Sequence, residues 1–158
     1  HIIKRAWSDN DKVTLNLPMR LRVSRRYNNS AAIHRGPLTF SLRIGSMWKQ
    51  IGGEAPHADY EVHPRTKWNY ALVLDADNPE KSLDVTEHSI RMPCFSEINA
   101  PVTISAKARE LPSWGMDGAS AAPPPVSPVA TDSPVEEVEL VPYGSAKLRI
   151  TEFPVTEE

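Results

Sequence analysis

The chain has 158 residues, the size of one domain, and a formal net charge of −2. Its 15 prolines are well above the usual share of about 5% and exclude a helical bundle, because proline inside a helix costs about 3 kcal/mol. Its 18 basic and 20 acidic residues nearly cancel and leave no electrostatic footprint for a nucleic-acid partner.

Alternation of apolar and polar residues with period two is the dominant pattern along the chain. It begins at residues 2–6 and recurs at 13–17 and 19–23, which are joined by Pro18. It predicts further short strands at residues 31–34, 38–44, 60–63, 83–86, 102–108 and 147–151. Residues 68–74 are apolar at nearly every position, which predicts a central strand, whereas the shorter and more acidic segment 136–141 suits an edge strand.

Turn-forming residues separate these segments, as at 28–30, 52–53, 75–79 and 143–145. Residues 78–80 (Asn-Pro-Glu) suit a single helical turn, and no segment carries a longer helical stripe. The sequence therefore predicts one all-β domain over residues 1–158, an antiparallel two-sheet β-sandwich of jelly-roll-like form.

One segment has a biased composition. Residues 112–134 contain six of the 15 prolines, including the run at 123–125. Strand alternation resumes on both sides, so we predict one long Pro-rich loop of the same domain rather than a domain boundary. Trp114 lies in this loop beside Gly115, which makes it a candidate contact with a neighbouring surface.

Two polar clusters can be considered as metal sites. On a strand, alternate residues share one face, which would present His57, Asp59, Glu61 and His63 together. We favour a polar outer face there, with Tyr60 and Val62 turned inward, because nothing in one straight strand fixes a tetrahedral arrangement. Residues 75–78 offer oxygens of the kind calcium prefers, but an ordinary Asp/Asn turn is favoured, so we expect no metal.

Four aromatic residues are the candidates for contact with a carbohydrate or a neighbouring domain: Trp48, Trp68, Tyr70 and Trp114. Trp68 and Tyr70 share strand parity, so one face would carry both rings; in a β-sandwich such pairs more often fill the core.

Catalytic residues and cofactors are not indicated. The single cysteine, Cys94, has no activating neighbour in sequence and suits an inert thiol. With 20 acidic residues, no spacing singles out a pair of facing carboxylates. The longest apolar run, 70–74, is far shorter than the roughly 20 residues of a membrane helix, so we expect no membrane partner, and the compartment stays open.

Several short strings follow one another in order along nearly the whole chain. They lie at residues 4–7 (KRAW), 11–13 (DKV), 35–38 (RGPL), 59–62 (DYEV), 68–72 (WNYAL), 101–104 (PVTI), 140–144 (LVPYG) and 147–151 (KLRIT). Together they resemble the C-terminal region of bacterial β-L-arabinofuranosidase-type glycoside hydrolases, similar to glycoside hydrolase family 127.

This resemblance implies a non-catalytic accessory domain that braces the α/α barrel of a parent chain. The family places its glutamate acid/base and its zinc-bound cysteine nucleophile in that barrel. Cys94 does not match the catalytic motif, so neither a catalytic residue nor zinc is carried over to this chain. The resemblance also implies that residues 1–13 continue a strand from upstream sequence, so that the chain is a domain fragment.

Two other functions stay open. One is a carbohydrate-binding module that uses exposed Trp and Tyr side chains to bind plant-type oligosaccharides. The other is a self-sufficient hydrolase with an unrecognised carboxylate pair.

Overall fold

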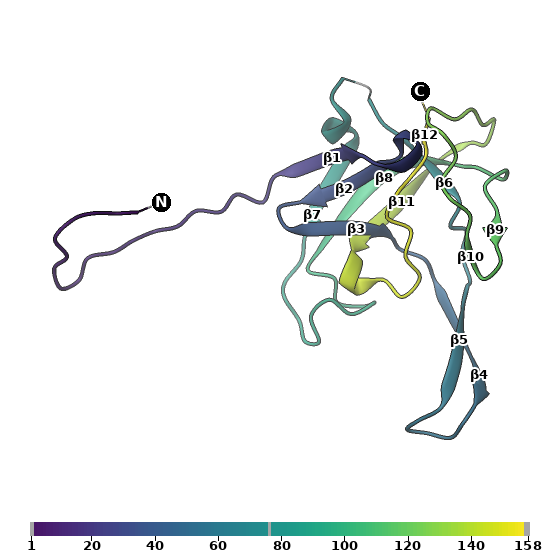
Figure 1. Ribbon diagram of the computed structural model, residues 1–158, viewed down its shortest axis with the longest axis horizontal. Helices are drawn as coiled ribbons and strands as arrows, with labels where there is room; N and C mark the ends of the chain where they lie inside the picture. Colours follow the sequence, from purple (N-terminus) through teal and green to yellow (C-terminus); the bar gives the residue numbers. More distant parts are fainter. Residues whose placement is uncertain (1, 76, 157–158) are drawn as a thin grey trace.

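The computed structural model describes residues 2–75 and 77–156 of the chain. Its described residues form an all-β structure with one large curled sheet, two small two-stranded sheets and three short 3-10 turns (Figure 1). Two expectations fall partly outside these residues: the strand at 1–13 includes His1, and the Asp/Asn turn at 75–78 includes Ala76.

The large sheet has eight strands in the order β1-β2-β3-β11-β8-β6-β12, with β7 also paired to β8. Their bounds are β1 Leu21–Arg25, β2 Ala31–Arg35, β3 Leu38–Leu42, β6 Tyr70–Val73, β7 Leu83–Glu87, β8 Val102–Glu110, β11 Val135–Pro142 and β12 Val155–Thr156. The small sheets are the hairpins β4 (Ser46–Gly52) with β5 (Asp59–Pro64), and β9 (Met116–Asp117) with β10 (Ser120–Ala121). The 3-10 turns are η1 (Tyr27–Asn29), η2 (Pro79–Ser82) and η3 (Tyr143–Ser145).

The C-terminal segment draws the two ends of the sheet together. Val155 of β12 lies opposite Leu72 in a parallel pairing with β6. Just before it, Phe153 exchanges two backbone hydrogen bonds of 2.8 and 2.9 Å with Ala31 of β2. The expectation of a purely antiparallel arrangement was therefore wrong, because this last strand runs parallel to its neighbour.

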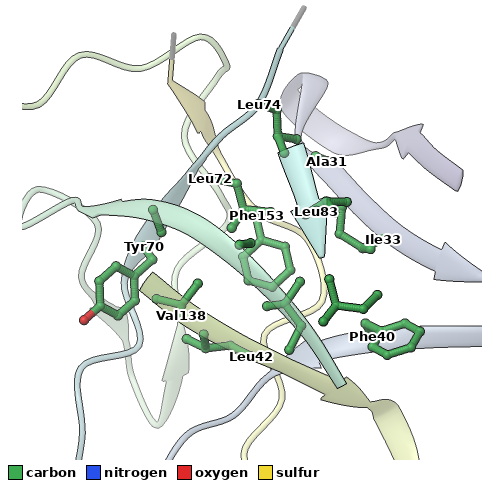
Figure 2. Close-up of a cluster of buried hydrophobic side chains, with 14 of the residues drawn as sticks. Ala31, Ile33, Phe40, Leu42, Tyr70, Leu72, Leu74, Leu83, Val138 and Phe153 are labelled. Atoms are coloured by element: carbon green, nitrogen blue, oxygen red, sulfur yellow. The ribbon is translucent and has the colours of Figure 1, made fainter. Parts of the chain in front are cut away.

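The curled sheet encloses a hydrophobic core (Figure 2). Its largest fully buried side chains include Phe40, Phe153, Ile33, Leu72 and Ile104. Each such side chain stabilises the fold by about 1.5–3 kcal/mol relative to an exposed position. On β8, Val102, Ile104, Ala106 and Ala108 are all buried, as period-two alternation predicts for one face of a strand.

Several strands expected from alternation are confirmed. The predicted segments at 31–34, 38–44, 60–63, 68–74, 83–86, 102–108 and 136–141 correspond to β2, β3, β5, β6, β7, β8 and β11. The single helical turn expected at 78–80 is η2, which begins at Pro79. Asp75 accepts backbone hydrogen bonds from Asp77 and Asn78, at 2.8 and 2.7 Å, as an Asp turn does.

The strands expected at residues 2–6 and 13–17 are wrong, whereas the strand expected at 19–23 is confirmed in part, because β1 spans Leu21–Arg25. Residues 2–20, all of which the structure describes, form no strand, and the sheet begins at Leu21. We call residues 2–19 the N-terminal arm; it extends away from the sheet (Figure 1). Alternation marks a side-chain pattern, but a strand also needs a neighbouring strand to pair with, and none pairs with the arm in the described structure.

The strand expected at 147–151 is also absent, and these described residues form an irregular segment after η3. The edge position expected for residues 136–141 is wrong too, since β11 pairs with β3 on one side and β8 on the other. Its acidic side chains instead have partners on or just beyond the neighbouring strands: Glu139 pairs with Arg43, which follows β3, and Glu137 accepts a 2.7 Å hydrogen bond from Ser105 of β8.

Candidate functional site

The β4–β5 hairpin projects from the large sheet (Figure 1). It carries an exposed aromatic pair. Trp48 lies opposite Val62, and Gln50 lies opposite Tyr60. Paired residues share a face of a sheet, so Trp48 and Tyr60 are neighbours there. Their rings meet edge to face at 5.9 Å between centroids, and the two residues are 49% and 48% exposed.

The inward position expected for Tyr60 is therefore wrong. The hairpin forms a separate two-stranded sheet, so this face is not covered by the large sheet in the way that a sandwich would cover it. β4 itself was not among the predicted strands, because residues 46–52 do not alternate between apolar and polar.

The opposite face of the hairpin carries the polar side chains expected there, together with the exposed Met47. Glu61 lies 3.1 Å from His63 and 3.7 Å from Lys49. The hydrogen bond from His63, followed by the charge of Lys49, lowers the pKa of Glu61. Among residues 2–75 and 77–156, no group of three or more His, Cys, Asp and Glu side chains is arranged to hold a metal ion.

A hollow of about 240 Å³ lies at the base of this hairpin, and we call it the hairpin groove. Its lining residues are Ile44, Pro64, Trp68, Met116, Ala119, Ser120, Ala121, Lys147, Leu148, Arg149 and Ile150. The ammonium of Lys147 also lies 5.8 Å from the ring centroid of Trp48. The groove therefore adjoins the exposed aromatic face of the hairpin.

The charged groups that line the hairpin groove are both positive. Lys147 and Arg149 are exposed, and neither has a carboxylate partner in the part of the chain that the structure describes. The guanidinium of Arg149 lies 4.3 Å from the ring of Tyr143, and its Nε donates to the carbonyl of Ala146 at 3.0 Å. The groove thus combines apolar walls with two cations, one of which is held in place.

Trp114 is buried, with only 3% of its surface exposed. Its ring meets that of Trp68 edge to face at 5.3 Å between centroids, and its Nε1 donates a 2.8 Å hydrogen bond to the carbonyl of Ala122. Both partners belong to this chain, so Trp114 holds the 112–134 segment against Trp68. Trp68 itself is half-buried and lines the hairpin groove.

Tyr70 is also buried, and it lies at the margin of the core (Figure 2). Its hydroxyl donates a 3.0 Å hydrogen bond to Glu136. Burial, together with this carboxylate, raises the pKa of Tyr70. Lys67 lies between Glu110, at 2.7 Å, and Glu136, at 3.4 Å, and these contacts raise the pKa of Lys67.

Three of the four predicted aromatic residues therefore lie in one region. Trp68 is in the wall of the hairpin groove, and Trp114 packs on Trp68. Trp48 lies next to Lys147, which also lines the groove. Tyr70 is tied to the carboxylates instead. Tyr60, Lys147 and Arg149 were not predicted as site residues. The placement of Lys147 beside Trp48 joins segments far apart in the chain, and no local pattern signals it.

Scans against protein-family models, curated proteins and solved structures found no match for this chain. Within the described residues, no helix has both the length and the apolar character needed to cross a membrane.

Proposed function

We propose that this chain is a non-catalytic accessory domain of a glycoside hydrolase similar to the β-L-arabinofuranosidases, and that it braces the catalytic α/α barrel of the parent chain. In this proposal the curled sheet and its hairpins correspond to the jelly-roll-like β-sandwich of that family. The ordered strings along the sequence support the family, and the exposed N-terminal arm supports the bracing role.

The arm is the observation that carries this role. Val13, Leu15 and Leu17 alternate along it and are 62%, 77% and 72% exposed. Burying apolar surface is favourable by about 25 cal/mol per Å², so an exposed row of this kind marks a surface that another domain covers.

The test begins with the reading frame upstream of His1. The proposal expects a long region with the periodicity of helical hairpins, and a different upstream region would overturn it. Limited trypsin digestion then compares the longer protein with the isolated chain. We expect cleavage after Lys12 in the isolated chain and protection in the longer protein; equal cleavage in both would refute the bracing role of the arm.

Activity is tested on the same two proteins with aryl arabinofuranosides. We expect turnover by the longer protein alone. Turnover by the isolated chain would overturn its non-catalytic role and would direct attention to its carboxylates, beginning with Glu110 and Glu136.

A carbohydrate-binding module is the second candidate function, and the half-exposed Trp48–Tyr60 pair beside the groove favours it. Exposed aromatic faces of this kind provide large contact area for a ligand. The test is calorimetric titration with plant oligosaccharides, using Trp48→Ala as the variant. Met47→Ala changes an equally exposed side chain on the opposite face and serves as the matched control.

A further inference from the structure

We propose that the hairpin groove binds an acidic sugar, a uronate unit of an acidic oligosaccharide, in preference to a neutral one. This inference rests on the carbohydrate-binding candidate function and adds the class of ligand. It follows from three observations: the sign of the charge, the character of the walls and the size of the hollow.

The charge of the groove is positive and unbalanced. Lys147 and Arg149 line it, and its lining contains neither aspartate nor glutamate among the described residues. Glu61 of the hairpin is on the opposite face and is engaged by His63 and Lys49. A ligand carboxylate would therefore meet two cations without a competing acid.

Both cations are positioned by aromatic rings. The ammonium of Lys147 lies 5.8 Å from the centroid of Trp48, within the range of a cation–π contact, and Tyr60 supports Trp48 from its edge. The guanidinium of Arg149 lies over Tyr143, and its Nε is bonded to backbone oxygens, which leaves its terminal nitrogens for a ligand. Trp48 thus acts as a positioning residue that holds Lys147 at the groove.

The walls and the size of the groove favour a sugar over a bare anion. Trp68, Pro64, Met116 and Ile150 present apolar surface, which suits the C–H faces of a sugar ring but offers nothing to an inorganic phosphate. The volume of about 240 Å³ is below the roughly 300–1,000 Å³ of pockets that enclose a drug-sized molecule. One sugar ring would occupy the groove while the rest of the oligosaccharide lies outside.

A nucleic acid would offer the same negative charge, but the chain has more acidic than basic residues and its isoelectric point is about 6.2. An extended basic surface, which nucleic-acid binding uses, is therefore not expected. The acidic sugar is the ligand that uses both the cations and the apolar walls.

The test is calorimetric titration of the chain with trigalacturonate and, in parallel, with neutral arabinotriose. We expect binding of trigalacturonate that is several-fold tighter than that of arabinotriose and that weakens as salt is raised to about 1 M. Lys147→Gln should weaken it about fivefold, the upper range for an exposed ion pair, whereas Lys147→Arg should retain it. Lys49→Gln, on the opposite face of the same hairpin, is the matched control and should bind as the unaltered chain does.

Other results of these titrations would distinguish failure of the acidic-sugar proposal from failure of the carbohydrate-binding function. Equal binding of both trisaccharides, unchanged in Lys147→Gln, would overturn the preference for an acidic sugar and leave the carbohydrate-binding function standing. Binding of neither would overturn both. Binding of poly-L-glutamate or of a single-stranded oligonucleotide as tight as that of trigalacturonate would also overturn the proposal, since the groove would then be a general anion site.

Discussion

Replacing Trp114 by alanine tests how much this one side chain contributes to holding the Pro-rich segment on the body of the protein. Trp114 is 3% exposed, its ring packs on Trp68, and its indole N–H is bonded to the carbonyl of Ala122. Trp114→Ala removes all three contributions together. The rest of the 112–134 segment keeps its other hydrogen bonds, such as those from Asn28 Nδ2 to the Pro124 carbonyl and from Thr131 Oγ1 to the Glu110 carbonyl, both 2.8 Å.

The magnitude follows from these contacts. Truncation of a buried tryptophan to alanine costs about 3–5 kcal/mol, and we expect about 3 kcal/mol because an irregular segment can partly collapse into the space. For a chain of 158 residues this lowers Tm by roughly 6–12 °C. Trp114→Phe retains a packed ring and leaves only the carbonyl of Ala122 without its donor, so it should cost about 1 kcal/mol.

Urea unfolding followed by tryptophan fluorescence, together with thermal unfolding followed by circular dichroism, measures both variants. Trp48→Ala is the control, because its side chain is half exposed and should cost less than about 1 kcal/mol. If Trp114→Ala costs no more than Trp48→Ala, Trp114 is not a core residue. If Trp114→Phe costs as much as Trp114→Ala, the hydrogen bond rather than the packing fastens the segment.

Three further predictions concern other parts of the molecule. Burial and two nearby arginines lower the pKa of His34 below 6.5, so the unfolded chain binds more protons than the folded one. Stability should therefore fall as the pH drops below about 6.5, and His34→Gln should show a smaller fall in Tm between about pH 7.5 and about pH 5.5; an equal fall would contradict this. Glu136→Gln removes a charge that raises the pKa of Tyr70, so the phenol should ionise at lower pH in an absorbance titration; an unchanged titration would refute the link. Deleting residues 2–17, which form no strand, should leave Tm within about 2 °C, and a larger loss would show that the arm packs on the sheet.

Period-two alternation predicted a strand correctly where the alternating segment also has a neighbouring strand to pair with. Residues 38–44 and 102–108 show one apolar face, and each has a neighbouring strand, so β3 and β8 form where expected. Residues 13–17 carry the same pattern without a neighbour and form no strand. The pattern records which face can be buried, while the partner is supplied by a distant part of the chain.

The candidate site was predictable only in its aromatic members. Trp48, Trp68 and Trp114 stand out by residue type, but whether each ring is exposed or buried depends on packing by other segments. Trp114 lies beside a glycine in a Pro-rich segment and is nevertheless buried, because Trp68 and Ala122 meet it there. Lys147 and Arg149 were not predicted either, because their position at the groove also depends on packing by other segments.

The backbone pairing of Phe153 with Ala31 has a consequence for how the protein is made. These two residues are separated by nearly the whole sheet in sequence, yet they join its opposite ends. The ribosome synthesises the chain from its N-terminus. The backbone groups of Ala31 in β2 therefore stay without their partner until the residues near 153 have been synthesised. Contacts of such long sequence separation slow folding, and they leave the core open to proteases and to other chains during synthesis.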